Sequence, residues 1–380
     1  MLVWARRRAG VSKAEVASRL LGGNTSRLSA WETGSDQPTF EQARKLAALF
    51  RVPLPYFFFS DPPPEEAQPI PDLRTVGDHA RPISLALRDV VRDARRKQDW
   101  LRDVRLAEDV PALSFVGACS PEDVPKAVEV LREFLGPPDE VRRRVSSEDE
   151  YLRLLCRNAE AAGVLVLRSS VVDNNNHRPI DVDDFRGFAL VDTHAPVVFI
   201  NTRDAPVAQV FTLLHELAHI VAGITGVSNS PVASATKTHQ RSEEISCNKI
   251  AAEFLVPERE FRQQWDTRGV FAEKVDKLRR HFRVSRLVVA RRALDLGFVG
   301  QALFWEYARP VLDKATSDRS KSEGGPAFSV LVRARNGQLF TRQVVSAARS
   351  GQLQYRDAAT LLNIRPKHVD DLAVKMMVEE

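Results

Sequence analysis

The stretch VAQVFTLLHELAHIVAGI, residues 207–224, decides the fold of the largest part of this 380-residue chain. Apolar residues occupy nearly every position of a helix drawn through it, and neither Pro nor Gly occurs between Val207 and Ala222. The stretch therefore predicts a buried helix. His215, Glu216 and His219 interrupt the apolar run before it reaches the length that a bilayer needs, which argues against a membrane span.

The spacing of these three polar residues predicts a metal site. His215 and His219 are four residues apart, so a helix stacks both imidazoles on one face, where they can hold a divalent cation. Glu216 follows the first histidine and can reach a water bound to that cation. A pair of hydrogen-bonded core histidines is the alternative, but burying three polar groups without a ligand is costly. The pattern is typical of a zinc hydrolase.

A catalytic zinc usually takes three protein ligands and keeps the fourth position for water, so one ligand must come from elsewhere. Residues 220–228 contain no His, which excludes the histidine-rich metzincin arrangement. A second predicted helix begins after an N-cap at Ser242 and stops at Pro257. On this helix we expect Glu244 to be the third ligand, with Glu243 as the alternative. Two acids after a serine cap also suit the helix dipole without any metal.

The segments FTLLHELAH, EISCN and AAEFLVP resemble the ImmA/IrrE family of bacterial metallopeptidases, and so do FRGFALVD and PVVFIN upstream. The resemblance covers residues 150–300 closely. It implies a zincin-like domain whose site residues are the metal ligands His215, His219 and Glu244, the general base Glu216, and Asn248 near the ligand helix. Zinc is the expected metal, although manganese and iron accept the same ligands. Cys247 stands where the family more often has alanine, and a small residue is kept.

The expected mechanism follows from these roles. The metal lowers the pKa of its water and polarises a peptide carbonyl. Glu216 takes the proton of that water and later passes it to the leaving amine. We expect strands at residues 185–191 and 197–201, one of which could offer an exposed edge to an extended peptide substrate. Three residues are chemically suited to stabilise the oxyanion, and none is favoured: Arg203, His239 and Tyr307.

The N-terminal residues 1–58 predict a separate bundle of small helices, broken at glycines and at Pro38. This region looks like a Cro/repressor-type (XRE) helix-turn-helix domain. The core expected from that similarity is Val16, Ala17, Leu20, Leu28, Trp31 and Leu46. The helix that such domains place in the major groove of DNA would start with Thr25, Ser26, Arg27, Ser29 and Ala30.

Charge supports a nucleic-acid role for this region. Residues 1–60 contain nine Lys and Arg against four Asp and Glu, an excess of five. The formal charge of the whole chain is also +5, so everything after residue 60 sums to zero. The basic character is therefore concentrated where the helix-turn-helix is expected, which favours binding to double-stranded DNA. Docking to a protein is the alternative.

The rest of the chain predicts two more regions besides the peptidase. We expect residues 1–60 to form the DNA-binding domain, 61–110 a linker and connecting helix, 111–300 the peptidase domain and 301–380 an accessory domain. DPPPEEAQPIP, residues 61–71, is rich in proline and charge and predicts an extended linker. Residues 85–105 alternate acidic and basic side chains with few large apolar groups, which predicts a solvated connecting helix.

In the accessory domain, SVLVRARNGQLFTRQVV predicts a β-hairpin that turns at Asn336-Gly337, and two short helices follow it. Residues 273–296 have the spacing of a second helix-turn-helix, but their apolar face favours packing under the peptidase. His177 lies in a polar loop, where a solvated histidine is the simpler interpretation. The fold class predicted for the whole chain is mainly α with a small β-sheet.

These features predict a DNA-binding transcriptional regulator that cleaves a repressor or an antitoxin-like protein with a metal-dependent endopeptidase. The alternative is a non-proteolytic repressor whose metal domain senses a ligand or docks a partner. The three cysteines have no paired spacing, so we expect neither disulfides nor a cysteine metal site. MLVWARRRAG lacks the apolar core of a signal peptide. We therefore expect a cytoplasmic protein without a membrane partner, and one that could form a homodimer.

Overall fold

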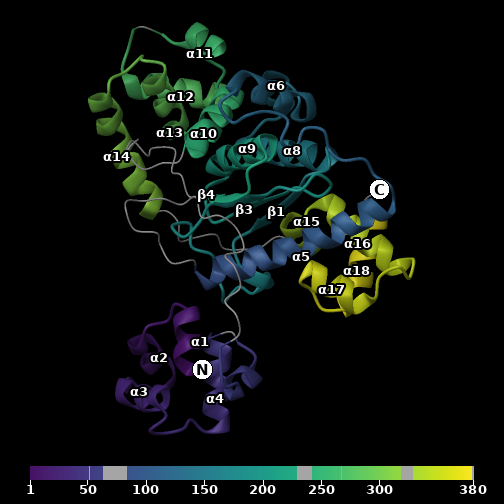
Figure 1. Cartoon of the computed structure of the whole chain (residues 1–380). Coiled ribbons are helices and arrows are strands. Elements are labelled where there is room, and N and C mark those ends of the chain that lie inside the picture. The colour runs from purple at the N-terminus through teal and green to yellow at the C-terminus, as the bar shows by residue number, and fades with distance from the viewer. Residues whose placement is uncertain (51, 63–83, 229–241, 267, 318–327, 379–380) are drawn as a thin grey trace. The chain divides into compact units, whose positions relative to one another are not determined.

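The computed structural model describes residues 1–50, 52–62, 84–228, 242–266, 268–317 and 328–378 (Figure 1). Contacts divide the chain into two compact units, one of which is N-terminal while the other holds nearly everything after residue 88. Residues 63–71, most of the predicted linker, lie outside the described residues. No described helix combines the length and the apolar character that crossing a bilayer requires. The boundaries expected near residues 60, 110 and 300 stay predictions.

Short helices around one apolar core build the N-terminal unit. They are α1 (Leu2–Arg8), α2 (Lys13–Leu20), α3 (Thr25–Thr33), α4 (Phe40–Phe50) and the 3-10 helix η1 (Leu54–Phe58). The side chain of Ser12 caps α2 by accepting the backbone N–H of Glu15, and that of Asn24 caps α3 by accepting the N–H of Arg27. The expected core is confirmed, since Val16, Ala17, Leu28, Trp31 and Leu46 are buried and Leu20 is half-buried.

A mixed four-stranded sheet forms the centre of the second unit. Its strands are β1 (Leu165–Ser169), β2 (Gly187–Leu190), β3 (Val197–Asn201) and β4 (Gly226–Ser228), in the order β1-β3-β2-β4. β1 and β3 run parallel, whereas β2 is antiparallel to both β3 and β4. The expectation that residues 185–191 or 197–201 offer an exposed edge is therefore wrong, because β2 and β3 each have a strand on both sides. The edges of the described sheet are β1 and β4.

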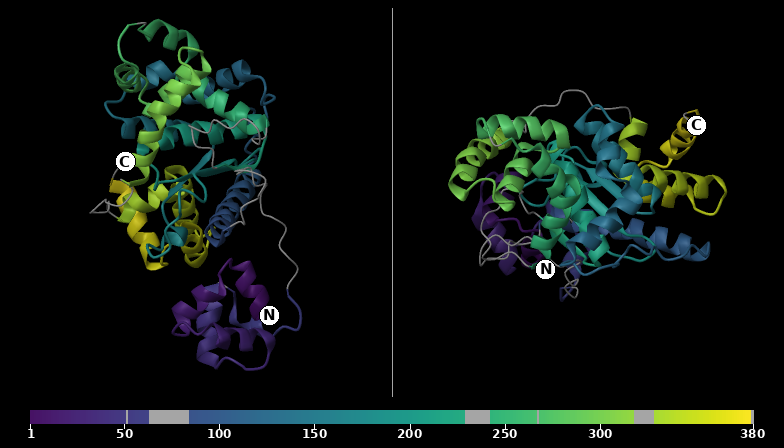
Figure 2. Two further views of the ribbon diagram at one scale, coloured as in Figure 1. Left: turned by 90° about the vertical axis from the view of Figure 1, so that its left-hand side faces the viewer. Right: turned by 90° about the horizontal axis from the view of Figure 1, so that it is seen from above.

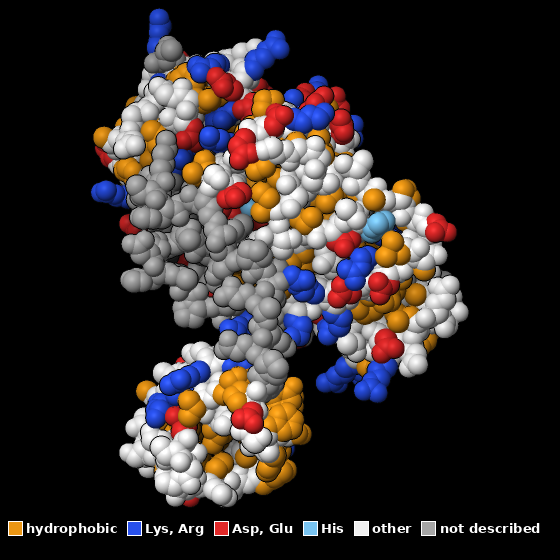
Figure 3. Space-filling model, in the orientation of Figure 1, with side chains coloured by type: hydrophobic (Ala, Val, Ile, Leu, Met, Phe, Trp, Pro, Cys, Tyr) orange, Lys and Arg blue, Asp and Glu red, His pale blue; other side chains and the backbone are white. Residues whose placement is uncertain are grey.

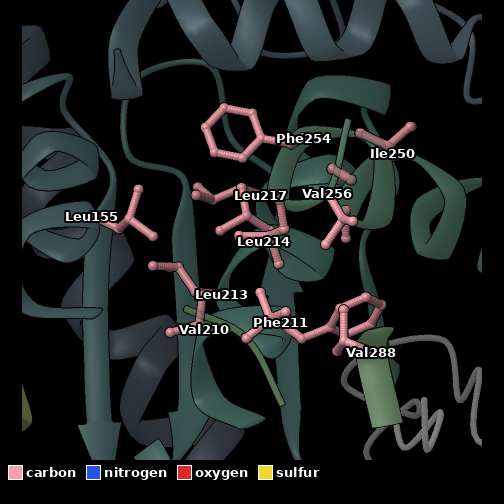
Figure 4. Packing of buried hydrophobic residues seen from close by; sticks show 14 of the residues in the cluster. Leu155, Val210, Phe211, Leu213, Leu214, Leu217, Ile250, Phe254, Val256 and Val288 are labelled. Carbon is pink, nitrogen blue, oxygen red and sulfur yellow. The ribbon is translucent and has the colours of Figure 1, made fainter. Parts of the chain in front are cut away.

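Helix α9 (Pro206–Ala222) packs on this sheet and joins it to the surrounding helices. It contacts β2 and β3 as well as α6 (Val124–Leu135), α8 (Glu148–Ala161) and α10 (Ser242–Leu255). Pro206 occupies the first turn and Gly223 ends the helix in the left-handed conformation, with φ of 71°. Figure 4 shows leucines of α9 packed with Leu155 of α8 and Phe254 of α10. The buried-helix prediction for residues 207–224 is confirmed.

Further helices enclose α10 and continue the same core. They are α7 (Pro138–Arg143), α11 (Glu258–Gln264), α12 (Phe271–Phe282), α13 (Arg286–Asp295) and α14 (Gln301–Ser317), and a one-turn helix η2 (Val172–Asn174) follows β1. In α12 and α13 the apolar face is buried, including Val275, Leu278, Phe282 and Val289. These residues belong to the same core cluster as those of α9 and α10, which agrees with the expected structural role rather than with a second DNA-reading module.

Helix α5 (Leu85–Ala107) differs from the expected solvated connection. Val90, Val91, Ala94 and Leu101 are buried, and the side-chain amide of Gln98 donates to the carbonyls of Leu190 and Ala195. The alternating charges mislead because most of them, such as Arg92, Arg95 and Asp99, lie on the exposed side of the helix, while a few apolar residues at helical spacing pack its other side. One charged residue, Lys97, is buried and pairs with Asp93. Much of α5 therefore belongs to the core of the second unit.

The C-terminal region is entirely helical where it is described, so the predicted hairpin is wrong. Its helices are α15 (Phe328–Asn336), α16 (Gln338–Arg349), α17 (Tyr355–Leu362) and α18 (Lys367–Val378). Gly337 has φ of 80°, but it separates two helices instead of turning a hairpin. Phe340, Val344, Val345 and Ala348 are buried at helical spacing. Trp100 of α5 packs edge-on against Phe340, and Figure 2 shows these C-terminal helices beside α5.

Candidate metal centre

Helix α9 positions two imidazoles and a carboxylate inside the second unit. His215, Glu216 and His219 are 3%, 0% and 0% exposed, so all three are withdrawn from bulk water. The two histidine rings lie 4.8 Å apart between centroids, and their Nε2 atoms are 3.1 Å apart. The i, i+4 spacing of a buried helix thus turns both Nε2 atoms toward one point.

Helix α10 brings the third charged group to this point. Glu244, in the first turn of α10, is 2% exposed. Its Oε1 lies 3.1 Å from His219 Nε2, and its Oε2 lies 3.3 Å from His215 Nε2. Glu243, the alternative ligand, is half-buried and is not part of this cluster. Because α9 and α10 pack against each other, Glu244 reaches histidines that are distant in sequence.

The spacing of these donor atoms fits a metal ion. Ligand atoms about 2.0–2.2 Å from a tetrahedral zinc lie roughly 3.3–3.6 Å from one another. The donor separations at His215, His219 and Glu244 are 3.1 Å, 3.1 Å and 3.3 Å, close to that value. The Nδ1 atoms of both rings are buried without a hydrogen-bond partner among the described residues. Two neutral rings and a carboxylate present three lone pairs to each other, and a cation relieves their repulsion.

Electrostatics at the cluster favour an ionised carboxylate. Burial by itself would raise the pKa of Glu244, but the adjacent imidazoles outweigh burial and hold that pKa at about 2. Burial would lower the pKa of His215, but the charge of Glu244 outweighs it and raises the pKa. For His219 burial prevails, and its pKa is lowered. The Glu244 carboxylate is therefore ionised at neutral pH, as a metal ligand must be.

Glycine at position 187 allows Glu216 to lie against the sheet. A Cβ atom at Gly187 would stand 2.7 Å from Glu216 Oε1, 2.8 Å from Thr212 Cγ2 and 2.9 Å from the carbonyl oxygen of Phe199. No larger residue fits without displacing one of them. Sequence reasoning missed Gly187, although a glycine at the start of a buried strand is a recognised signal of close backbone approach.

Two further residues of α10 face this region. Asn248, one turn after Glu244, lies near His215 and contributes to the raised pKa of that ring, after the larger effect of Glu244. Cys247 is fully buried, and burial together with nearby carboxylates raises the pKa of its thiol well above the ordinary value. A protonated thiol is a poor metal ligand. The described cluster of potential metal ligands accordingly comprises His215, His219 and Glu244.

The other residues singled out from the sequence lie elsewhere or are not described. His239 lies outside the described residues. Tyr307 of α14 packs edge-on against Phe271. The backbone N–H of Arg203 donates to the Asn201 side chain in the turn after β3. His177 is exposed in its loop. None of these is a member of the described metal-ligand cluster.

The five candidate DNA-contacting residues all lie on α3 of the N-terminal unit. Thr25, Ser26 and Arg27 are exposed, whereas Ser29 and Ala30 are half-buried. The guanidinium of Arg27 lies 5.3 Å from the ring centroid of Trp31, and Ser29 accepts a hydrogen bond from Lys13. α2 and α3 contact each other as the two helices of a helix-turn-helix do. On the face of the second unit seen in Figure 3, basic and acidic side chains are intermixed.

Comparison with protein families identifies three regions of the chain. Residues 2–57 match a helix-turn-helix family model, and residues 159–294 match the peptidase M78 model, described as the IrrE N-terminal-like domain. Residues 336–375 match a domain of unknown function. No curated protein matches the chain. The second region contains every residue of the cluster on α9 and α10.

Proposed function

Because the chain carries a helix-turn-helix domain and a metallopeptidase domain of the IrrE type, we propose that it is a DNA-binding regulator that hydrolyses a peptide bond in another protein. One observation carries the enzymatic half. Two histidine Nε2 atoms and the Glu244 carboxylate converge within 3.1–3.3 Å, next to the fully buried Glu216. A site that only stabilised the fold would need the three ligands but no adjacent carboxylate.

In this proposal His215, His219 and Glu244 hold a divalent metal, for which zinc is the first candidate and Mn²⁺ or Fe²⁺ are alternatives. Such a metal, when bound, supplies Lewis acidity toward a peptide carbonyl and acidifies water. Glu216 accepts a proton from the attacking water and donates it to the leaving amine, so one carboxylate acts first as base and then as acid. Gly187 keeps that carboxylate in place, since it leaves room for Oε1.

The peptide substrate would bind at the edge strand β4. β4 pairs with β2, and β2 begins with Gly187, where a Cβ would collide with Glu216. Among the described strands, none lies on the other side of β4. An extended peptide could therefore add to this edge through backbone hydrogen bonds, which selects unfolded segments or loops. At the other edge, β1 already contacts α15.

The DNA-binding half of the proposal rests on α3 and on charge. Thr25, Ser26 and Arg27 are exposed at the N-terminal end of α3, the end that helix-turn-helix domains turn toward base edges. The net charge of the chain comes from this region. We propose a repressor or antitoxin-like protein as the substrate, because a DNA-bound protease can reach a target that occupies the same operator.

The test is co-expression of the chain with proteins encoded beside it, in wild-type and Glu216→Gln forms. The wild type should yield a fragment that the Glu216→Gln form does not, while metal analysis finds the same metal content in both. Glu243→Gln is the matched control, because it removes a neighbouring carboxylate outside the cluster and should cleave normally. Wild-type cleavage by a metal-loaded Glu216→Gln protein would contradict the mechanism and favour a non-proteolytic repressor.

A further inference from the structure

A cavity lies where α8 and β1 meet the C-terminal helices, apart from the α9–α10 cluster. Residues of α8 and of the turn after α7 form one wall, β1 forms the floor, and α15 with the start of α16 forms the other wall. Its volume is about 790 Å³. This is in the range of about 300–1,000 Å³ that small-molecule sites occupy. None of the residues of the metal cluster lines it.

Arginine dominates the charged lining of this cavity. Five arginines line it, together with two glutamates: Arg144, Arg153, Arg157, Arg168, Arg333, Glu150 and Glu160. This excess contrasts with the second unit as a whole, since the sequence after residue 60 has no net charge. Arginines are therefore concentrated at this cavity, whereas basic and acidic residues are equal in number over the sequence after residue 60.

Both carboxylates of the cavity are engaged by nearby hydrogen-bond donors. Glu150 accepts the backbone N–H and the hydroxyl of Ser146, each at 2.7 Å. Glu160 accepts the backbone N–H of Gln338 at 3.1 Å and so caps the start of α16. Neither forms a described ion pair with the arginines of the cavity. The five arginines still outnumber the two carboxylates of the lining, although Arg153 also pairs with Asp149 outside it.

Several of the guanidinium groups remain available. Arg144 and Arg157 have no ion pair among the residues that the structure describes, and both are exposed. Arg168, on the floor, donates through Nη2 to Gln209 at 3.1 Å, but its Nε is buried with no partner in the described part of the chain. A buried donor without a partner destabilises the protein. An incoming acceptor would remove that destabilisation.

We propose that this cavity binds a phosphorylated small molecule of nucleotide size. Guanidinium groups bind phosphate through paired N–H donors, and several of them together favour a group with more than one negative charge. Val145, Leu154, Val166 and Val330 supply apolar wall for the uncharged part of the ligand. Because α8 and α15 lie on opposite walls, the bound ligand links the IrrE-type domain to the C-terminal helices. This proposal does not depend on peptidase activity.

Calorimetric titration of the full chain with three probes tests this: AMP, inorganic phosphate and adenosine, all in excess Mg²⁺. AMP should bind best, phosphate more weakly and adenosine not at all, and AMP should raise the melting temperature. Arg144→Gln and Arg157→Gln should each weaken AMP binding about tenfold, the effect of one lost charge-assisted hydrogen bond. Both side chains are exposed, so the variants should melt like the wild type in the absence of AMP.

Two control variants separate this cavity from general attraction of anions. Arg143→Gln removes the neighbouring arginine, which is exposed, pairs with Asp139 and does not line the cavity. Arg27→Gln removes a basic group of the helix-turn-helix. Neither should change AMP affinity. The proposal is overturned if AMP shows no saturable binding, if adenosine binds as tightly as AMP, or if Arg143→Gln weakens binding as much as Arg144→Gln.

Discussion

At the residue scale, the candidate site depends on a few close contacts between side chains of different elements. Glu244 matters because its two oxygens face two different imidazoles, at 3.1 Å and 3.3 Å. Glu216 matters because it is buried beside them with room for its carboxylate above Gly187. Replacing a carboxylate with an amide at Glu216 or Glu244, or adding a methyl group at Gly187, should therefore distinguish residues that bind the metal from residues that take part in hydrolysis.

The Gly187→Ala substitution should reduce peptide hydrolysis at least about tenfold while leaving metal content unchanged. The added methyl group would displace the Glu216 carboxylate, and small misplacements of a catalytic group are costly to rate. Gly300→Ala is the control, because a Cβ there meets nothing within 4 Å. Cleavage assays with metal analysis and circular dichroism check the result. Equal activity of Gly187→Ala and the wild type would show that Glu216 needs no such support.

The Glu244→Gln substitution should weaken metal binding by roughly 100-fold, because it replaces a charged ligand with a neutral amide. Competition with a fluorescent chelator measures the affinity. Glu243→Gln changes the adjacent residue in the same way and should retain wild-type affinity, since Glu243 is not part of the cluster. If the two variants lose metal equally, Glu244 is not the third ligand.

At the scale of single elements, caps and buried faces decide which helices form and where they pack. α16 begins at Gly337, whose φ of 80° suits glycine, and its first amides are capped by Glu160 of α8. A Cβ at Gly337 would lie 2.6 Å from Glu160 Oε1. The junction between the peptidase domain and the C-terminal helices is therefore built around one buried carboxylate.

This carboxylate should make stability depend on pH. Burial raises the pKa of Glu160 to about 7, although the amides of Gln338 and Leu339 and the charge of Arg168 act to lower it. In the unfolded chain the carboxyl loses its proton near its ordinary pKa of 4.5, whereas in the folded protein it keeps the proton up to a pH of about 7. The resulting contribution to stability is fully present below pH 4.5 and is lost as the pH rises through about 7.

We therefore expect the unfolding free energy of the wild type, relative to Glu160→Gln, to fall as the pH rises between those values. The expected fall is on the order of 3 kcal/mol. Denaturant titrations of both proteins at several pH values measure this fall. Subtracting the unfolding free energy of Glu160→Gln from that of the wild type removes the contribution of groups that titrate in both proteins. A difference that stays constant with pH, or rises, would contradict the raised pKa.

At the scale of the whole molecule, charge and chemistry are divided between the two units. The N-terminal unit carries the excess of basic residues, and the second unit carries the cluster of metal ligands. The proposed regulator needs both, since one part would hold the operator while the other cleaves a protein bound there. Each half can be tested without the other.

Replacing Arg7, exposed on α1, and Arg27, exposed on α3, with glutamine should flatten the salt dependence of duplex DNA binding. Each lost phosphate contact reduces the slope of log affinity against log salt by about 0.9. Arg143→Gln, in the second unit, should leave the slope unchanged. Binding isotherms at several salt concentrations measure the slopes. An unchanged slope in the Arg7→Gln, Arg27→Gln protein would count against DNA binding through α3.

Local sequence was sufficient for several features of this protein. The apolar run of α9 and the short N-terminal helices, separated by Gly and Pro, follow from local patterns that act between near neighbours. The i, i+4 spacing of His215 and His219 fixes their common face for the same reason. The strands around Phe188 and Val198 are expected instead from the resemblance of FRGFALVD and PVVFIN to the ImmA/IrrE family. The α+β class follows from these elements.

Long-range contacts decided the rest, because they depend on partners that periodicity does not reveal. Asn336-Gly337 reads as a hairpin turn, yet Gly337 meets Glu160 of a distant helix and two helices form instead. The alternating charges of α5 predict a solvated helix, yet its apolar residues Val91, Ala94 and Leu101 are buried in the second unit.

The sequence by itself therefore determined which residues can bind a metal and which helix carries two of them. Only the tertiary structure decided that Glu244 meets both imidazoles, that Gly187 leaves room for Glu216, and that five arginines surround one cavity. The physical reason is that helix geometry is set by bonds between neighbouring residues, whereas distance between elements is set by how their buried faces pack.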